Sequence, residues 1–187
     1  MPFFETEIPG LLVYEPKVFR DDRGYFFESY NENTFKESGI HISFVQDNQA
    51  RSVYGVLRGL HYQLAPHAQT KLIRVLEGEI MDVVVDIRKG SPTYGRAFTV
   101  RLSADNKKQL LVPKGFAHGY AVLSQTAEVM YKCDAFYNKT CEGGIIFNDP
   151  ELNIDWGIPL DKAIVSEKDI KLLSLAKATH NFVFELS

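Results

Sequence analysis

Two histidines, a lysine and a tyrosine stand in segments that otherwise have the composition of buried strands. His61 lies in RGLHYQ and His118 in VPKGFAHGY, while Lys71 and Tyr131 lie among aliphatic residues further along the chain. Burying a lysine is costly unless it pairs with an opposite charge or serves a function. These side-chain types can move protons and stabilise an anion, although each taken alone is compatible with an ordinary core or strand-end position.

The segments that carry these residues predict an all-β fold. Runs rich in β-branched and aromatic residues are separated by turn residues at short intervals. The strongest runs are SFVQDNQARSV, VLRGLHYQ, TKLIRVLEGEIMDVVVDIRKG, YGRAFTVRLSADNKKQLLVP, AHGYAVLSQTAEVMYKCDAFY and GGIIFN. Helix is predicted only in NENTFKES, capped by Asn31 or Asn33, and in SEKDIKLLSLAKA, capped by Ser166. Many antiparallel strands with little helix indicate a sandwich or jelly-roll barrel, a fold that encloses ligand cavities.

Strand alternation predicts which side chains share a face. It places Lys71 with Ile73 and Val75, and it groups Val129, Tyr131 and Cys133. In VLRGLHYQ the same rule groups Leu57, Gly59, His61 and Gln63 and sends Arg58 to the opposite face, unless Gly59 marks a bulge that turns Arg58 round. Turn residues at 77–79 and 103–106 predict hairpin connections.

Length and composition set broad limits. With 187 residues the chain can bury a core without a disulfide or structural metal, and we expect one domain over residues 1–187. Its 21 basic and 24 acidic residues give a net charge of −3 without a basic block, so neither nucleic acid nor a membrane surface is an expected partner. No signal sequence or membrane span is recognisable, and we expect a cytoplasmic protein. Cys133 and Cys141 are expected as free thiols.

The segment around His118 has the spacing Pro-x-Gly-x-x-His, formed by Pro113, Gly115 and His118. This spacing resembles the second motif of the cupin superfamily of small β-barrels. The first cupin motif normally supplies His-x-His and binds a metal, whereas this chain reads His61-Tyr62-Gln63. Two inward histidines are too few for a shell of three or four ligands, so we expect no bound metal and no other cofactor.

Longer motifs resemble one family, the dTDP-4-dehydrorhamnose 3,5-epimerases, which are metal-free cupins. The matching segments, in the family's order and at nearly its spacing, are PKVFRDDRGYFFESYN, FVQDN, VLRGLHYQ, KLIRV, GEIMDVVVDIRKGSPTYG, LSADNKKQLLVPKGFAHGY, YKCDAFY, FNDPELNIDW and SEKD. The departures are mild: Tyr62, where phenylalanine is common, and the C-terminal HNFVFELS, which has no family pattern. The resemblance implies a cupin-type jelly-roll barrel with short flanking helices.

The resemblance also implies a reaction and its catalytic residues. The family's substrate is a nucleotide-linked 4-keto-6-deoxyhexose, whose C3 and C5 protons are both α to the ketone. Inverting these centres needs a base, an acid on the opposite face and a group that stabilises the enolate. His61 matches the base, Asp169 in SEKD matches the carboxylate that orients it, and Tyr131 matches the acid. Lys71 matches the cation near the C4 oxygen.

A nucleotide site and an assembly follow from the same resemblance. The matching binding positions are Arg23, Glu28, Gln46, Asp47, Asn48, Arg58, His118, Tyr137, Glu142 and Lys168. Tyr137 matches the aromatic residue that stacks on the thymine, and arginines suit the diphosphate because their planar fork is bidentate. Family members are homodimers whose N-terminal strands cross to the partner, which implies that Arg23 and Glu28 serve the other subunit's pocket.

Other functions compete with this one. A 3-epimerase that makes a single inversion would use the same base and enolate site, although the presence of Tyr131 favours double inversion. A non-catalytic sugar-binding cupin would be expected to lack His61, Asp169 or Tyr131, and all three are present. A metal-dependent cupin oxygenase or isomerase would need the missing ligand. We therefore expect an epimerase that converts dTDP-4-dehydro-6-deoxy-D-glucose into dTDP-4-dehydro-L-rhamnose in dTDP-L-rhamnose biosynthesis.

Overall fold

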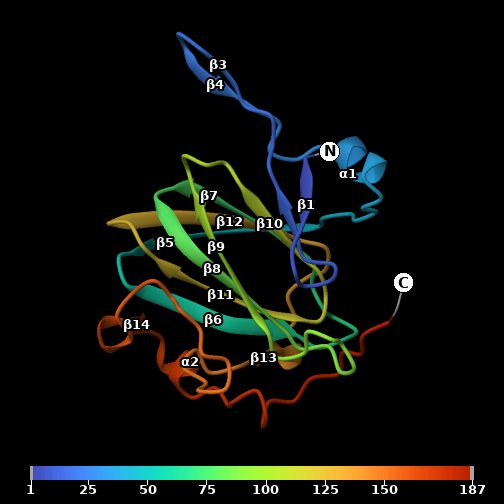
Figure 1. Cartoon of the computed structure of the whole chain (residues 1–187), viewed down its shortest axis with the longest axis vertical. Helices are drawn as coiled ribbons and strands as arrows, with labels where there is room; N and C mark the ends of the chain where they lie inside the picture. Colours follow the sequence, from blue (N-terminus) through green and yellow to red (C-terminus); the bar gives the residue numbers. More distant parts are fainter. Residues whose placement is uncertain (1, 186–187) are drawn as a thin grey trace.

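The computed structural model describes residues 2–185, which form two antiparallel sheets packed face to face (Figure 1). The first sheet has the strand order β1 (Phe3–Glu5), β2 (Leu12–Tyr14), β10 (Gln109–Val112), β7 (Lys71–Glu77), β12 (Thr126–Cys133) and β5 (Gln46–Val53). The second has the order β13 (Glu142–Gly144), β6 (Val56–Gln63), β11 (Phe116–Val122), β8 (Glu79–Asp86) and β9 (Ala97–Ser103), and β14 (Ile164–Val165) runs parallel to β6. This arrangement confirms the predicted all-β jelly-roll barrel.

Helices are short and lie outside the sheets. They are α1 (Glu32–Glu37), α2 (Glu167–Ile170) and the 3-10 turns η1 (Lys139–Cys141) and η2 (Leu160–Lys162). Asn31 and Ser166 cap α1 and α2 as predicted. The second predicted helix, however, ends at Ile170 rather than at 178. Beyond it, the backbone makes tertiary hydrogen bonds instead, with Leu173 O accepting from Ile146 N at 2.9 Å and Leu175 N donating to Asp149 Oδ2 at 2.7 Å.

Apolar side chains fill three layers. Between the sheets lie aliphatic residues of both, among them Ile73, Val84 and Val129. The outer face of the second sheet packs against the C-terminal part of the chain, where Trp156 is buried. The outer face of the first sheet is covered by α1 through Phe35. Lys71, Ile73 and Val75 share the inner face of β7, and Val129, Tyr131 and Cys133 share that of β12, as alternation predicted.

Both predicted hairpins are wrong, because the flanking strands belong to different sheets. The turn at 77–79 joins β7 to β8, and the turn at 103–106 leads from β9 towards β10. Each link therefore carries the chain from one sheet to the other. Turn residues indicate that the chain reverses direction, but they do not determine whether the two strands then pair.

Arg58 points into the barrel and not to the opposite face that strict alternation predicts, because β6 has one extra residue relative to β11. His118 pairs with His61 and Tyr120 with Arg58, so three steps along β6 face two steps along β11. Such a bulge shifts the alternation by one residue. Arg58 and His61 consequently both line the barrel interior, and the bulge allowed for at Gly59 is present. Gly59 has a φ of +119°, and a Cβ there would lie 2.5 Å from Gly119 Cα.

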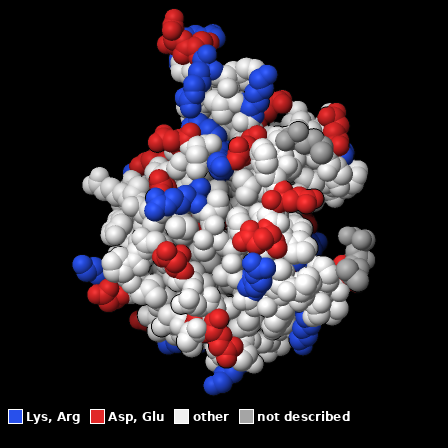
Figure 2. Space-filling model, viewed as in Figure 1, with Lys and Arg blue, Asp and Glu red and all other residues white. Residues whose placement is uncertain are grey.

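A two-stranded hairpin projects from the barrel (Figure 1). It consists of β3 (Phe19–Asp21) and β4 (Gly24–Phe26), which pair only with each other among the described strands. We call residues 17–28 the N-terminal arm. On the face shown in Figure 2, Lys and Arg side chains are interspersed with Asp and Glu, including at the tip of this arm.

The described part of the chain contains no helix that is long and apolar enough to cross a membrane. Residue 1 and residues 186–187 of the predicted domain lie outside the described residues. The single domain over 1–187 and the cytoplasmic location stay predictions.

We predict that Gly59→Ala lowers the free energy of unfolding by about 2 to 4 kcal/mol, because the methyl group meets backbone atoms and the backbone conformation disfavours a side chain. The measurement is urea denaturation at a fixed protein concentration. Gly39→Ala is the matched control: Gly39 also has a positive φ, of +80°, but has nothing within 4 Å of an added Cβ. It should cost only about 1 kcal/mol. Equal losses in the two variants would contradict the packing argument.

Candidate active site

A cavity of about 500 Å³ opens between the two sheets. It brings together the four predicted catalytic residues with Arg58, His118 and Lys168. Its lining is Ala50, Val56, Leu57, Arg58, His61, Lys71, His118, Tyr120, Tyr131, Ile164, Val165, Ser166, Lys168 and Asp169. Residues far apart in the sequence thus meet at one polar site with an apolar wall.

A histidine and a buried carboxylate form a pair on one wall. His61 Nε2 lies 2.7 Å from Asp169 Oδ1, and Gly59 N donates to Asp169 Oδ2 at 3.3 Å. The position of Asp169 follows from the local sequence, because Ser166 Oγ caps α2 by accepting from Asp169 N at 3.1 Å. Burial acts to raise the pKa of Asp169, but its hydrogen bonds with His61 and Gly59 outweigh burial and leave the pKa below its ordinary value. Asp169 is therefore ionised at neutral pH.

Tyr131 and Lys71 reach the cavity from the opposite sheet. Both stand on the first sheet, whereas His61 stands on the second. Burial raises the pKa of Tyr131 to about 12, so the phenol keeps its proton at neutral pH. Lys71 Nζ lies 5.8 Å from the centre of the Tyr131 ring. Burial lowers the pKa of Lys71, although Cys133 and nearby carboxylates act in the opposite direction.

Two residues of this site were missed from the sequence. Asp82, fully buried on β8, has its Oδ1 2.7 Å from His118 Nε2 and so fixes the second histidine. Its signal was an acidic residue inside the apolar run EIMDVVVD. Tyr120 lines the cavity with a buried hydroxyl that has no partner among the described residues, and its signal was its place two residues after His118, on the same strand face.

Four of the predicted binding residues form a hydrogen-bonded rim beside the cavity and contact a fifth, Lys168, which lines the cavity itself. Gln46 Oε1 accepts from Tyr137 N at 3.0 Å, and Gln46 Nε2 donates to Asn48 Oδ1 at 3.0 Å. The Tyr137 hydroxyl donates to Glu142 Oε2 at 3.0 Å, and the ammonium of Lys168 pairs with the same carboxylate. Burial would raise the pKa of Glu142, but the contacts with Lys168 and Tyr137 lower it. Tyr137 is 53% exposed, which leaves its ring free to stack.

Three predicted binding residues lie elsewhere in this chain. Asp47 pairs with Lys132 at 3.0 Å, and the two are ladder partners on the face of the first sheet that points away from Tyr131. Arg23 and Glu28 belong to the N-terminal arm and do not line the cavity of their own chain. Asp47 cannot place its side chain in the barrel, because the residues on either side of it, Gln46 and Asn48, take the inward positions.

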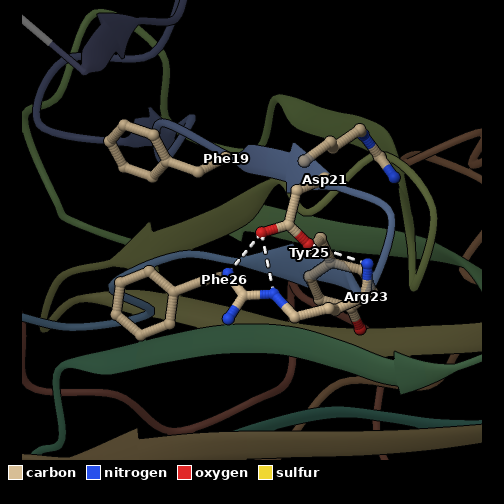
Figure 3. Close-up of a pocket in the computed structure, with 6 residues that line it drawn as sticks. Phe19, Asp21, Arg23, Tyr25 and Phe26 are labelled. Atoms are coloured by element: carbon tan, nitrogen blue, oxygen red, sulfur yellow. Dashed lines mark hydrogen bonds and ion pairs between the residues drawn. The ribbon is translucent and has the colours of Figure 1, made fainter.

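The arm has its own polar and aromatic surface (Figure 3). The Arg23 side chain forms an ion pair with Asp21, while the Phe19 and Phe26 rings lie on the other side of the same hollow. The Arg23 side chain is 90% exposed, and Phe26 is 68% exposed. Exposed aromatic rings beside an exposed Arg23–Asp21 ion pair are typical of a contact surface.

Residues 2–185 contain no group of three or more His, Cys, Asp and Glu side chains that could hold a metal ion. The two cysteines are free thiols, as predicted. What the cavity does contain is a histidine hydrogen-bonded to a buried carboxylate, a phenol on the opposite wall and the side chain of Lys71. This set can remove a proton from one face of a carbon acid, return one to the other face, and stabilise the anion between these steps.

Comparisons with known proteins agree with this geometry. The family model for dTDP-4-dehydrorhamnose 3,5-epimerase matches residues 5–177. The chain is 54% identical over 171 residues to an enzyme of that name from Shigella flexneri, covering 91% of this chain and 93% of the relative. It is similar to the crystal structure of the Elizabethkingia anophelis enzyme, with 52% identity, a TM-score of 0.88, and coverage of 92% of this chain and 94% of that one. It is also similar to a Legionella pneumophila epimerase in complex with dTDP-4-keto-L-rhamnose, with 46% identity, a TM-score of 0.89, and coverage of 94% and 93%.

We predict that Asp169→Asn lowers the free energy of unfolding at pH 7 by about 1 to 3 kcal/mol, the range for charge-assisted hydrogen bonds. Since the folded pKa of Asp169 is below its unfolded value of about 4, its contribution is complete above pH 4 and is lost as the pH falls through the folded pKa. The difference in stability between variant and wild type should therefore narrow as the pH falls from about 4 towards 3. Urea denaturation at one protein concentration measures it.

Glu167→Gln is the control for this experiment, because Glu167 is an exposed residue of the same helix. It should change stability little at any pH. If the difference in the free energy of unfolding between Asp169→Asn and wild type stays constant down to pH 3, the carboxylate charge is not what stabilises the pair.

Proposed function

The chain belongs to the dTDP-4-dehydrorhamnose 3,5-epimerase family, and on that premise we propose that it inverts C3 and C5 of dTDP-4-dehydro-6-deoxy-D-glucose to give dTDP-4-dehydro-L-rhamnose. One observation carries the proposal: the His61–Asp169 pair and the Tyr131 phenol stand on opposite walls of one cavity with Lys71 enclosed between the sheets. Inversion at carbon requires a proton to leave one face and another to arrive on the other.

Proton removal falls to His61. Because Asp169 holds Nε2, the remaining ring nitrogen, Nδ1, is free to accept the α-proton from the sugar. The carboxylate also stabilises the imidazolium that forms, since it stays ionised at neutral pH. Gly59 N adds a second hydrogen bond to the same carboxylate, so the pair is held by the backbone of the strand that carries the base.

Lys71 supports the enolate. As the proton leaves, negative charge moves to the C4 oxygen, and an ammonium in an enclosed site stabilises that charge far more strongly than it would in water. His118, fixed by Asp82, and Arg58, turned inward by the bulge, provide further donors on the second sheet. Loss of the C3 proton and loss of the C5 proton give two different enolates, but both place their negative charge on the C4 oxygen, so the same cations serve both centres.

Proton delivery falls to Tyr131. A phenol with a pKa of about 12 is protonated at neutral pH and is a weak enough acid to recover its proton after each transfer. It stands on the first sheet, facing His61 across the cavity. A proton given from this side to the enolate carbon completes the inversion.

Nucleotide binding is assigned to the rim. Tyr137 offers an exposed ring for stacking on the thymine, and Gln46, Asn48 and Glu142 offer polar groups already held by mutual hydrogen bonds. Lys168 lies beside them, and its charge suits the diphosphate. The nucleotide and the sugar would thus lie in adjoining parts of one cleft.

The N-terminal arm is assigned to a homodimer. Arg23 and Glu28 match binding positions of the family but lie outside the pocket of their own chain, and the arm extends away from the barrel with its aromatic side chains exposed (Figures 1 and 3). We propose that the arm completes the partner's pocket, where Arg23 would meet the diphosphate. The exposed Phe19 and Phe26 would then become buried on dimerisation.

The mechanism is tested by measuring solvent deuterium exchange at C3 and C5 separately from inversion of these carbons. Without the phenol, Tyr131→Phe can still form the enolate, and its simplest fate is reprotonation by His61 from the original side. In D₂O this variant should place deuterium at C3 or C5 of recovered substrate while inversion falls by about 10²-fold or more. NMR of the nucleotide sugar gives both rates in one sample.

His61→Ala should neither exchange nor invert at a measurable rate in the same assay, because the base itself is missing. If Tyr131→Phe inverts as often as it exchanges, another acid serves the far face. If wild type exchanges and inverts only at C3, the enzyme is a single-site 3-epimerase. If wild type does neither, the proposed function fails.

The homodimer is tested by complementation. Arg23→Ala and His61→Ala should each be nearly inactive alone. In a mixed dimer the Arg23→Ala chain keeps its own His61 and receives an intact arm, so one of the two pockets is complete. Random pairing after co-expression should restore about a quarter of wild-type activity, since half the dimers are mixed and each has one complete pocket. Co-expression of His61→Ala with Tyr131→Phe is the control and should restore nothing, because both residues belong to the same pocket.

A further inference from the structure

The chain continues beyond the family match as a segment fixed to the barrel. We call residues 178–185 the C-terminal strap, and all of it follows the matched range 5–177. On one side it is tied to the end of β6: the Tyr62 hydroxyl donates to Thr179 O at 2.8 Å, and the Asn181 side chain both accepts from Ala65 N and donates to Ala65 O at 3.1 Å. Tyr62 directly follows His61 in the sequence, so the strap holds the strand that carries the proposed base.

On its other side the strap is tied to the loop after β8. Lys89 N donates to Phe182 O at 3.0 Å, and Phe184 N donates to Lys89 O at 2.9 Å. The two phenylalanines that make these hydrogen bonds differ in their surroundings. Phe182 is 8% exposed and meets the Tyr62 ring edge to face at 6.2 Å, whereas Phe184 covers the Arg88 guanidinium at the surface.

Phe182 lines a second, much smaller cavity of about 10 Å³. The other residues around it are Tyr62, Gln63, Gln69, Lys71, Val112, Gly115, Phe116 and His118. Lys71 and His118 therefore line both this cavity and the large one, and they form the partition between them. A space of this size holds at most about one water molecule, and Phe182 forms part of its wall on the far side of Lys71 from the large cavity.

Charged and titratable groups face Lys71 from several strands. Tyr131 and Cys133 face it from β12, Asp82 from β8, His118 from β11 and Glu142 from β13. Burial has the largest effect on the pKa of Lys71 and lowers it, and the negative groups only partly compensate. The enclosure to which Phe182 contributes is thus the main influence on this ammonium.

We propose that Phe182 is a positioning residue for the reaction: it closes the barrel behind Lys71, so that the ammonium charge acts on the substrate oxygen without water reaching it from behind. This inference rests on the proposed function, in which Lys71 stabilises the enolate. An ammonium screened by water on one side would attract the developing charge less strongly. Shortening Phe182 joins its volume to the small cavity and admits that water.

The first test needs no turnover. The pKa of Lys71 is measured by ¹⁵Nζ NMR titration, with the resonance assigned by its loss in Lys71→Arg. In Phe182→Ala the pKa of Lys71 should rise by roughly 0.5 or more, because water relieves the cost of burying the charge. Phe184→Ala is the matched control, since it removes the same side chain from the same strap at a position that does not line the cavity, and it should leave the pKa of Lys71 unchanged.

The second test is kinetic. Phe182→Ala should lower kcat by roughly 3- to 30-fold with little change in KM, a smaller loss than the roughly 10²- to 10³-fold cost of deleting an oxyanion donor. The alkaline limb of its pH profile should move to higher pH, following Lys71. Phe182→Leu should stay within about twofold of wild type, because it fills most of the space. Phe182→Val should lie between Leu and Ala, and it replaces Ala if that variant does not fold.

A loss of kcat without movement of the alkaline limb or of the pKa of Lys71 would show only loosened structure and would overturn the inference. Equal changes in kcat and in the pKa of Lys71 in Phe184→Ala would also overturn the inference. If wild type proves inactive on the keto sugar while Phe182→Ala still shifts the pKa of Lys71, then the proposed function has failed, and only the control of Lys71 by Phe182 stands.

Discussion

The extra residue of β6 at Gly59 is the constraint on which the site depends. Because β6 takes three steps where β11 takes two, Arg58 and His61 share the interior face, while Leu57 and Leu60 remain in the outer core. The same residue supplies the backbone N–H that holds Asp169, the partner of His61. A glycine is required there, since the opposing strand comes too close to admit a Cβ. One local irregularity thus positions His61, its partner Asp169 and the Arg58 side chain together.

The site also depends on the jelly roll, because its two facing sheets line one cavity with different functional groups. The second sheet carries both histidines, each held by a buried carboxylate, and the first carries Tyr131 and Lys71. In the proposed mechanism the proton acceptor and the proton donor must meet the sugar from opposite sides, and the two facing sheets provide these sides. Burial keeps the Tyr131 phenol protonated at neutral pH.

The N-terminal arm and the C-terminal strap are placed differently relative to the barrel. The N-terminal arm extends away from its own pocket and presents Arg23 on an exposed surface, which suits a role in a partner's site. The C-terminal strap returns to its own barrel and places Phe182 behind Lys71. In the proposed enzyme the pocket is therefore completed from one side by another subunit and closed from the other by the chain's own C-terminal strap.

The sequence by itself determined the all-β class, the capping of α1 and α2, the inward lysine and tyrosine, and, through its resemblance to a family, seven of the residues that line the cavity. These features depend on residue type, local periodicity and motif order, all of which are local properties. Only the tertiary structure decided that the links at 77–79 and 103–106 cross between sheets, that the second helix stops at Ile170, and that Asp82, Tyr120 and Phe182 border the site. The physical reason is that each of these depends on which distant strand is the neighbour. Strand pairing across the barrel sets the register, and the register decides whether a polar residue such as Arg58 or Asp47 faces the cavity or the outer surface.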